Sequence, residues 1–241
     1  MILTVKNITK NFGGIRALNS CSFTIEDKKI TAIIGPNGSG KSTLFNIISN
    51  IIKKDSGYIF FNKKEISSFS SSQIAKLGIS RTFQDVRLFR NLTIKEHLEI
   101  ALNQHDESLI KSIFKKQQDN EERIKEILDL VGLQKPLTTY STDLSYGQRK
   151  LLDLAIAIAK PHTLLMLDEP VAGINPKLRL KIKEILRRLN KEGGTIVIIE
   201  HDMNFVMDLA EKIIVLDEGK VLVEGTPKQI QNNKKVVEAY L

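Results

Sequence analysis

The 241-residue sequence has one cysteine, no tryptophan and no long apolar run. A single cysteine, Cys21, cannot form a disulfide within the chain, so a reducing cytoplasm is the expected compartment. The longest unbroken apolar run, residues 154–159, is far shorter than the roughly 20 residues that a membrane-spanning helix needs. Residues 1–6 also lack the apolar stretch of a signal peptide. These absences argue against a membrane-spanning chain and against a disulfide-stabilised secreted domain.

The composition is that of a globular protein with a substantial core. Hydrophobic residues make up 41% and charged residues 27% of the chain, which excludes a disordered or collagen-like protein. Lys and Arg outnumber Asp and Glu by 36 to 28, a formal net charge of +8. This surplus fits nucleic acid, an anionic membrane surface or phosphate ligands as well as it fits solvated lysines. The length suits one domain with room for an inserted lobe.

Apolar runs typical of strands recur along the chain, with helical patterns between several of them, which predicts an α/β fold with a parallel sheet. Nearly continuous apolar runs predict the buried centre of this sheet at residues 30–34, 164–167 and 195–199.

Other strands are predicted by different patterns. Half-buried strands are expected at residues 2–8 and 21–25. Glu218 and Gly219, between the runs 213–216 and 220–224, predict a hairpin turn.

Helical spacing replaces the strand pattern between about residues 93 and 160. Thr93 with Glu96, and Ser145 with Gln148, match the capping box, so helices are expected to begin at these points. One face of a further helix is predicted from the spacing of Ile124, Ile127, Leu128 and Val131. This region is therefore predicted to be a helical lobe.

A phosphate-binding pattern, Gly-x-x-x-x-Gly-Lys-Ser, follows directly after the run 30–34. Its glycines allow backbone N–H groups to surround phosphate oxygens, and the next helix adds its positive N-terminal end. Lys41 is expected to neutralise the β and γ oxygens of a nucleotide, and Ser42 to offer its hydroxyl to Mg²⁺. The phosphate loop, residues 35–43, comprises Gly35, Pro36, Asn37, Gly38, Ser39, Gly40, Lys41, Ser42 and Thr43.

Two carboxylates, Asp168 and Glu169, follow the apolar run 164–167 at the end of a strand where ligands bind in open parallel sheets. Asp168 is expected to hold Mg²⁺, and Glu169 to orient and polarise the water that attacks the γ-phosphate. An acidic pair after a strand is by itself more often a loop start or a helix cap. The phosphate loop in the same chain favours the catalytic interpretation.

The signature segment, residues 144–148, reads Leu-Ser-Tyr-Gly-Gln at a predicted helix start. Free N–H groups and the helix dipole make such a start a second anion site. Gly147 keeps the backbone open to a ligand. Standing alone, the segment would be an ordinary helix cap.

The order and spacing of these motifs resemble those of the ATP-binding subunits of ABC transporters. Residues 35–43 are similar to the Walker A loop of that family, and residues 164–169 to its Walker B motif with a catalytic glutamate. The resemblance implies that Gln84 senses the metal and the attacking water, and that His201 contacts the γ-phosphate. It also implies that Phe12 stacks on adenine.

The same resemblance implies a fold of the P-loop NTPase class: a RecA-like core with an antiparallel β subdomain and an inserted helical subdomain. The core lobe is expected at residues 1–85 and 161–225, and the helical subdomain at 86–160. Residues 226–241 are expected to form a short appendage.

Each motif occurs once, and in this family the signature segment of one subunit completes the nucleotide site of another. The resemblance therefore implies that ATP pairs two subunits through Ser145, Gly147 and Gln148. ATP and Mg²⁺ are the expected cofactors, with Mg²⁺ held by Ser42, Gln84 and Asp168. The expected partners are two membrane permease subunits, a second ATPase subunit, identical or different, and indirectly a substrate-binding protein. These partners place the chain at the cytoplasmic face of the membrane.

Several segments resemble the ATPases of branched-chain amino acid importers: residues 81–93, 172–176, 200–203 and the ending Glu-Ala-Tyr-Leu. Importers of urea or other amides and lipopolysaccharide exporters remain alternatives. Tyr146 stands where the signature usually has a glycine, and Asn175 where a following loop, the D-loop, commonly has Asp. Both variants also occur in the importer branch.

A nucleic-acid ATPase of the same family is a further alternative, favoured by the basic composition. Such proteins need long coiled coils or added domains, but only 59 residues lie between Gln84 and Leu144. Two helices sharing them would reach at most about 45 Å, so no nucleic-acid partner is expected. A non-catalytic binding module is disfavoured because Lys41, Asp168 and Glu169 are intact. The other histidines, expected at the surface and making no zinc site, are His97, His105 and His162.

Overall fold

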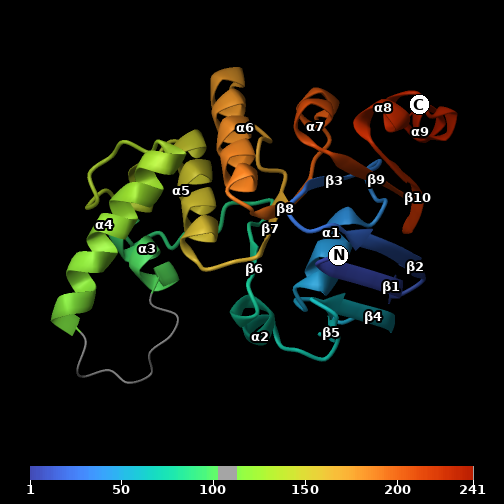
Figure 1. The fold of residues 1–241 in the computed structure, drawn as a ribbon, viewed down its shortest axis with the longest axis horizontal. Coiled ribbons are helices and arrows are strands. Elements are labelled where there is room, and N and C mark those ends of the chain that lie inside the picture. Colours follow the sequence, from blue (N-terminus) through green and yellow to red (C-terminus); the bar gives the residue numbers. More distant parts are fainter. Residues whose placement is uncertain (103–112, 241) are drawn as a thin grey trace.

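The computed structural model describes residues 1–102 and 113–240, which build two sheets and a set of helices (Figure 1). The larger sheet has the order β10-β9-β3-β8-β7-β6, and all its neighbours pair in parallel except the hairpin β9–β10. Its strands are β3 (Ile30–Ile34), β6 (Ile79–Arg81), β7 (Leu164–Asp168), β8 (Thr195–Ile199), β9 (Lys212–Asp217) and β10 (Lys220–Gly225).

The centre of this sheet matches the sequence prediction. Strands β3, β8 and β7 are neighbours, and every residue in each of them is buried, because helices and the second sheet cover both faces. Glu218 and Gly219 both have positive φ, 45° and 73°, as a two-residue hairpin turn requires.

The second sheet is antiparallel, in the order β2-β1-β4-β5. Its strands are β1 (Leu3–Phe12), β2 (Ile15–Ile25), β4 (Ser56–Phe61) and β5 (Lys64–Glu65). Cys21, Phe23 and Ile25 are buried on one face of β2, as their alternation predicts. Burial raises the pKa of the Cys21 thiol to about 12, so this cysteine stays protonated and serves as a core residue.

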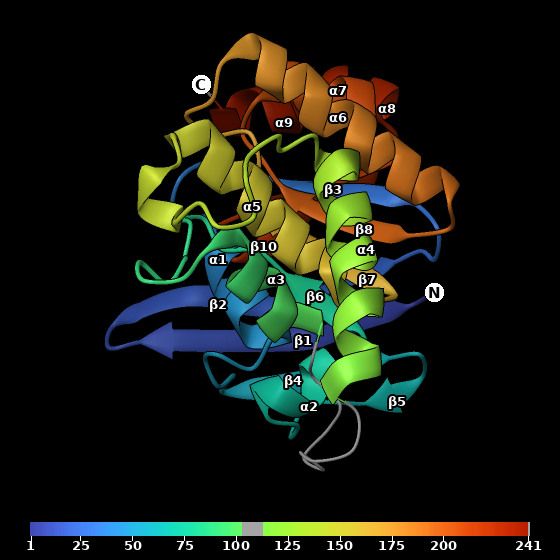
Figure 2. The ribbon, with the colours of Figure 1, turned by 90° about the vertical axis from the view of Figure 1, so that its left-hand side faces the viewer.

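Three helices between β6 and β7 form one end of the molecule, on the side away from β1 and β2 (Figures 1 and 2). They are α3 (Ile94–Leu102), α4 (Ile113–Val131) and α5 (Tyr146–Ala159), with a 3₁₀ turn at Ser141–Asp143. Both predicted capping boxes are present, at Thr93 with Glu96 and at Ser145 with Gln148.

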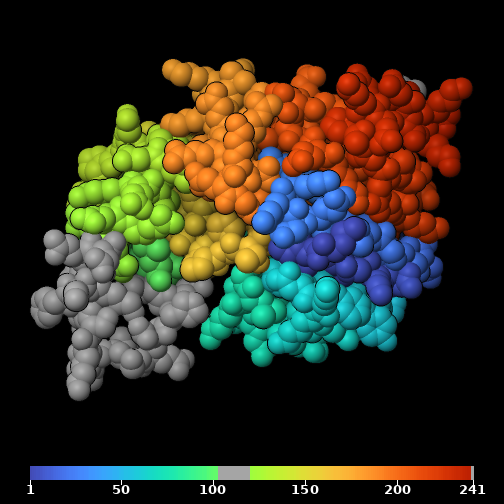
Figure 3. Space-filling view, viewed as in Figure 1, coloured from blue at the N-terminus to red at the C-terminus, as the bar shows by residue number. Residues whose placement is uncertain are grey.

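The remaining helices are α1 (Lys41–Ile48), α2 (Ser71–Lys76), α6 (Pro176–Lys191), α7 (Met203–Leu209), α8 (Pro227–Gln231) and α9 (Lys234–Tyr240). In the space-filling view, the green surface of α4 lies at one end of the molecule and the dark blue surface of β1 and β2 toward the other (Figure 3). None of the helices in the described ranges is long and apolar enough to cross a membrane.

The prediction that His97 lies at the surface is wrong. Only 4% of the residue is exposed, because it lies on the inner face of α3. Its Nε2 accepts a hydrogen bond from the Phe89 N–H at 3.0 Å, and its Nδ1 lies 2.8 Å from the Thr93 carbonyl oxygen. His162 is half-buried, and His105 lies outside the described residues. Within residues 1–102 and 113–240, no three His, Cys, Asp or Glu side chains gather as metal ligands would.

Candidate functional site

The phosphate loop joins β3 to α1 and leaves no room for side chains at two of its glycines. A Cβ atom on Gly35 would lie 2.0 Å from the carbonyl oxygen of Leu216, and one on Gly40 would lie 2.5 Å from that of Ala17. Gly40 also has φ 100°, which side chains disfavour. Because carbonyl oxygens of β2 and β9 lie this close to the two glycines, the loop backbone is held in one conformation.

The start of α1 is an open anion site. No side chain caps this helix, so its first N–H groups are available to phosphate oxygens. Lys41 is buried, and its Nζ donates hydrogen bonds of 2.8 Å to the carbonyl oxygens of Gly35 and Pro36. Burial lowers the pKa of Lys41, while the charges of Glu169 and Asp168 raise it. The ammonium therefore lies at the loop and close to the acidic pair, with the exposed Ser42 beside it.

Asp168 ends β7 and is 2% exposed. Its Oδ2 pairs with Nη2 of Arg81 at 3.3 Å, and its N–H donates to Oγ1 of Thr82 at 3.2 Å. Burial raises the pKa of Asp168, opposed by the positive charge of Arg81. Oδ1 is buried and has no hydrogen-bond partner among the described residues. A buried carboxylate oxygen with nothing to bind suits a hard cation, so the site fits Mg²⁺.

The three residues assigned to catalysis converge on the side chain of Glu169. Nε2 of Gln84 donates to its Oε2 at 3.2 Å, and Nδ1 of His201 lies 3.7 Å from its Oε1. Glu169 has φ 49°, a strained conformation for a residue with a side chain, and its N–H donates to the Ile199 carbonyl oxygen. The structure thus brings together Gln84, Glu169 and His201 from the ends of three neighbouring strands.

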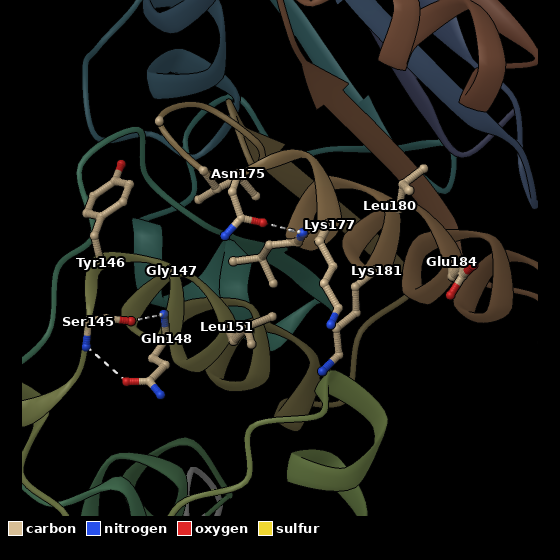
Figure 4. Close-up of a pocket in the computed structure, with 13 residues that line it drawn as sticks. Ser145, Tyr146, Gly147, Gln148, Leu151, Asn175, Lys177, Leu180, Lys181 and Glu184 are labelled. Carbon is tan, nitrogen blue, oxygen red and sulfur yellow. Dashed lines mark hydrogen bonds between the residues drawn. The ribbon is translucent and has the colours of Figure 1, made fainter.

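The signature segment caps α5. Oγ of Ser145 accepts from the Gln148 N–H, and Oε1 of Gln148 accepts from the Ser145 N–H at 3.0 Å (Figure 4). A Cβ on Gly147 would lie 2.7 Å from a methyl group of Leu178. Among the described residues, no hydrogen bond joins this segment to the phosphate loop.

A groove of about 800 Å³ lies between the start of α5 and α6 (Figure 4). The two departures from the usual family pattern line it. The ring of Tyr146 lies against Gly173, where an added Cβ would be 3.2 Å from the ring. Oδ1 of Asn175 accepts from the Leu178 N–H at 2.9 Å and caps α6. Both residues therefore shape the groove wall.

Phe12 ends β1, and the hairpin that it begins contacts the phosphate loop through Ala17. The side chain is 45% exposed, with Nζ of Lys10 5.3 Å from the ring centroid. An exposed ring on this hairpin suits stacking on a flat base.

Sequence reasoning missed three charged residues at the site: the half-buried Arg81 and the buried Lys150 and Glu200. Glu200 is 1% exposed, and its carboxylate accepts from the N–H groups of Val171 and His201. It thereby joins the loop after Glu169 to the loop that carries His201. In the sequence, these residues could have been found only as charged side chains within segments that are predicted to be buried strands or helices.

Comparisons with known proteins agree with this geometry. The family model described as "ABC transporter" matches residues 18–172, and one described as "Branched-chain amino acid ATP-binding cassette transporter" matches residues 220–241. The chain is 36% identical over 248 residues to the high-affinity branched-chain amino acid transport ATP-binding protein LivG of Salmonella typhimurium, covering 100% of this chain and 97% of the relative. It is 38% identical over 244 residues to the probable LivG of Archaeoglobus fulgidus, covering 100% and 95%.

Solved structures give the same result. A nucleotide-free ATP-binding cassette from an ABC transporter has a TM-score of 0.86 at 33% identity, covering 100% of this chain and 98% of the other. A dimeric bacterial ABC transporter cassette has a TM-score of 0.84 at 28% identity, covering 94% and 99%. The chain belongs to the ATP-binding proteins of ABC transporters and, within them, to the LivG-like group.

Proposed function

We propose that the chain hydrolyses ATP as one of two paired subunits that power the import of branched-chain amino acids through membrane permeases. The observation that carries this proposal is the convergence of Gln84 and His201 on the Glu169 carboxylate, beside the phosphate loop and Asp168. The LivG-like relatives supply the class of cargo.

The nucleotide would bind across the hairpin and the phosphate loop. Phe12 stacks on adenine, the loop N–H groups surround the phosphates, and Lys41 neutralises the β and γ oxygens. Asp168 Oδ1, Ser42 and Gln84 would hold Mg²⁺. When bound there, Mg²⁺ neutralises charge that develops on the phosphate oxygens.

The carboxylate of Glu169 would accept a hydrogen bond from the attacking water and so direct the water oxygen toward the γ-phosphorus. The Gln84 amide and the His201 ring fix the carboxylate by contacting different oxygens, 3.2 Å and 3.7 Å away. Phosphoryl transfer depends mainly on such positioning and on charge stabilisation. His201 remains 61% exposed, so it can also reach the γ-phosphate.

Among the described residues, no hydrogen bond joins the signature segment to the chain's own phosphate loop, which supports pairing of two subunits. Ser145, Gly147 and Gln148 would contact the γ-phosphate held by a second ATPase subunit, identical or different. A dimeric cassette among the similar structures is consistent with this arrangement.

The segment after Gln84 offers a surface to the permeases. Phe89 is 64% exposed, yet its N–H donates to His97 and its carbonyl oxygen accepts from Oγ of Ser141. An exposed aromatic ring on a fixed backbone suits a binding anchor. We infer that the paired ATPase subunits bind two permease subunits through this surface. This places the chain at the cytoplasmic face of the membrane. A substrate-binding protein would act indirectly.

The substitution Glu169→Gln tests the catalytic assignment, because the amide keeps the shape of the side chain but cannot accept a proton. Turnover should fall at least about a hundredfold, while ATP is still bound. The variant should form dimers with ATP and Mg²⁺, seen by light scattering, that dissociate when EDTA is added. Glu192→Gln, at the C-cap of α6, is the matched control. Turnover of the Glu169 variant near the wild-type rate would refute the assignment.

The transport assignment needs a separate measurement. Permeases of the matching system in liposomes should stimulate ATP hydrolysis by the wild-type chain, whereas DNA and RNA should not. Stimulation by nucleic acid alone would favour the nucleic-acid alternative.

A further inference from the structure

A buried lysine joins α5 to the catalytic loop. Lys150 is 4% exposed, and its Nζ donates hydrogen bonds of 3.1 Å to the carbonyl oxygens of both Gln84 and Glu169. No ion pair within 4.0 Å joins it to a carboxylate among the described residues. A buried ammonium is costly unless polar groups satisfy it. Here two carbonyl oxygens, one from each catalytic segment, provide that contact.

The carbonyl oxygen that Lys150 contacts belongs to Glu169, whose backbone conformation depends on its hydrogen bonds. Glu169 has φ 49°, a strained conformation that persists only when its surroundings hold it. Its N–H donates to the Ile199 carbonyl oxygen at 2.9 Å, and its carbonyl oxygen accepts from Ala172 N–H at 3.3 Å and from Lys150. Lys150 contacts this carbonyl oxygen from α5, at the helical end of the molecule.

The same end of α5 fits against the segment that follows Glu169. The Tyr146 ring lies against Gly173, and Gly147 allows Leu178 to approach. Nζ of Lys150 also lies 5.9 Å from the centroid of the Tyr146 ring. These turns carry the signature residues, so the helix that would contact the second subunit's nucleotide packs directly on the loop after Glu169.

We propose that Lys150 is a positioning residue that ties the signature helix α5 to Glu169 and Gln84 of the same chain. When the second subunit's nucleotide engages Ser145 and Gly147, the displacement of α5 sets the Glu169 carboxylate at the chain's own nucleotide. This inference rests on the proposed pairing of subunits. It states that the signature segment of one chain is linked to the Gln84 and Glu169 segments of the same chain through the ammonium group of Lys150.

The test compares three full-length variants: Lys150→Met, Lys150→Arg and the control Lys160→Met. Lys160 ends the same helix, and its ammonium makes no hydrogen bond to Gln84 or Glu169. Two quantities are measured for each: the single-turnover rate of hydrolysis at saturating ATP, and the dissociation constant for trinitrophenyl-ATP. Thermal unfolding is recorded beside them.

A misplacement of about 1 Å in an active site costs on the order of a hundredfold in rate. We therefore expect Lys150→Met to lower the single-turnover rate by about tenfold or more, with the dissociation constant within about twofold of wild type. Lys150→Arg should recover the rate to within about threefold, because a guanidinium has enough donors for both carbonyl oxygens. A Lys150→Met rate within twofold of the Lys160→Met rate overturns the proposal. Equal losses of rate and affinity, together with a lower melting temperature, also overturn it by indicating a structural role.

A measurement of dimerisation distinguishes a failure of this proposal from a failure of the proposed pairing of subunits. In the Glu169→Gln background, chains with Lys150 and with Met at that position should dimerise at similar ATP concentrations, because the signature residues are unchanged. If neither dimerises, the proposed pairing fails, and the single-turnover comparison still decides whether Lys150 positions Glu169. If only the Lys150→Met chain stays monomeric, Lys150 acts on the signature segment and the proposal is wrong.

Discussion

Asp153 is a half-buried carboxyl on α5. It lines a small cavity with Thr82, Lys150 and Pro170. Burial raises its pKa from 3.8 to about 7, and the nearby charge of Lys150 only partly opposes this shift. Between about pH 4 and pH 7 the native carboxyl therefore keeps a proton that the unfolded chain has lost. By linkage, this group's contribution makes the folded state less stable as pH rises through that range.

Asp153→Asn should remove this contribution, because the amide does not ionise. At pH 8 the variant should be more stable than wild type by up to about 4 kcal/mol, since the pKa shift is about three units and each unit is worth about 1.4 kcal/mol. At pH 4.5 the difference should be small. Urea unfolding at both pH values measures it, with the exposed Asp129→Asn as control. A difference of the same size at both pH values would mean that packing, and not ionisation, causes it.

The candidate site was predictable only where residue type reveals chemistry. Lys41 in a glycine-rich loop and Asp168 after a buried strand have spacings that phosphate and metal binding require, and the structure places them near one another. Lys150 and Glu200 were missed because their partners are main-chain groups, the carbonyl oxygen of Gln84 and the N–H of Val171. Any residue has such groups, so only the three-dimensional arrangement reveals these contacts.

At the scale of elements, α6 begins where the usual D-loop aspartate is replaced. Asn175 accepts a hydrogen bond from the Leu178 N–H, and Pro176 occupies the first helical position. Asn and Asp cap helix starts about equally well. The replacement therefore keeps the cap while removing a negative charge from the loop.

Asn175→Ala should lower the free energy of unfolding by about 1 kcal/mol, whereas Asn175→Asp should leave it within a few tenths. Urea unfolding with an unchanged m-value would measure both differences. A loss of equal size in both variants would show that the Asn175 amide makes a contact other than the cap. A loss in neither would show that the cap contributes nothing measurable.

The strands of the larger sheet were easier to predict than those of the smaller one. In β3, β7 and β8 both faces are covered, so nearly every residue is apolar. No strand was predicted at β4, where only Ile59 and Phe61 of the sequence Ser-Gly-Tyr-Ile-Phe-Phe are buried. β4 pairs with β1, about 50 residues earlier, and a short half-buried strand becomes definite only when such a partner is present.

At the scale of the whole molecule, two apolar clusters lie on opposite faces of the larger sheet. Ile33 belongs to one, with the residues of α1 and the antiparallel sheet. Ala32 belongs to the other, which also contains Leu98 of α3, Ile124 of α4 and Leu152 of α5. The helical end of the molecule therefore shares its core with the central sheet. Because they share one core, we expect the two parts to unfold together.

The absence of tryptophan makes this expectation directly measurable. Tyr140, beside the helical end, and Tyr58, on β4, are 50% and 56% exposed, so Tyr140→Trp and Tyr58→Trp introduce single fluorescent probes with little disturbance. In urea without nucleotide, the two probes and far-UV circular dichroism should give coincident midpoints, as a two-state transition requires. The wild-type chain, followed by circular dichroism alone, checks that neither substitution shifts the midpoint. An earlier transition at Trp in position 140 would mean that the helical end unfolds independently, and that the shared cluster does not couple it to the sheet.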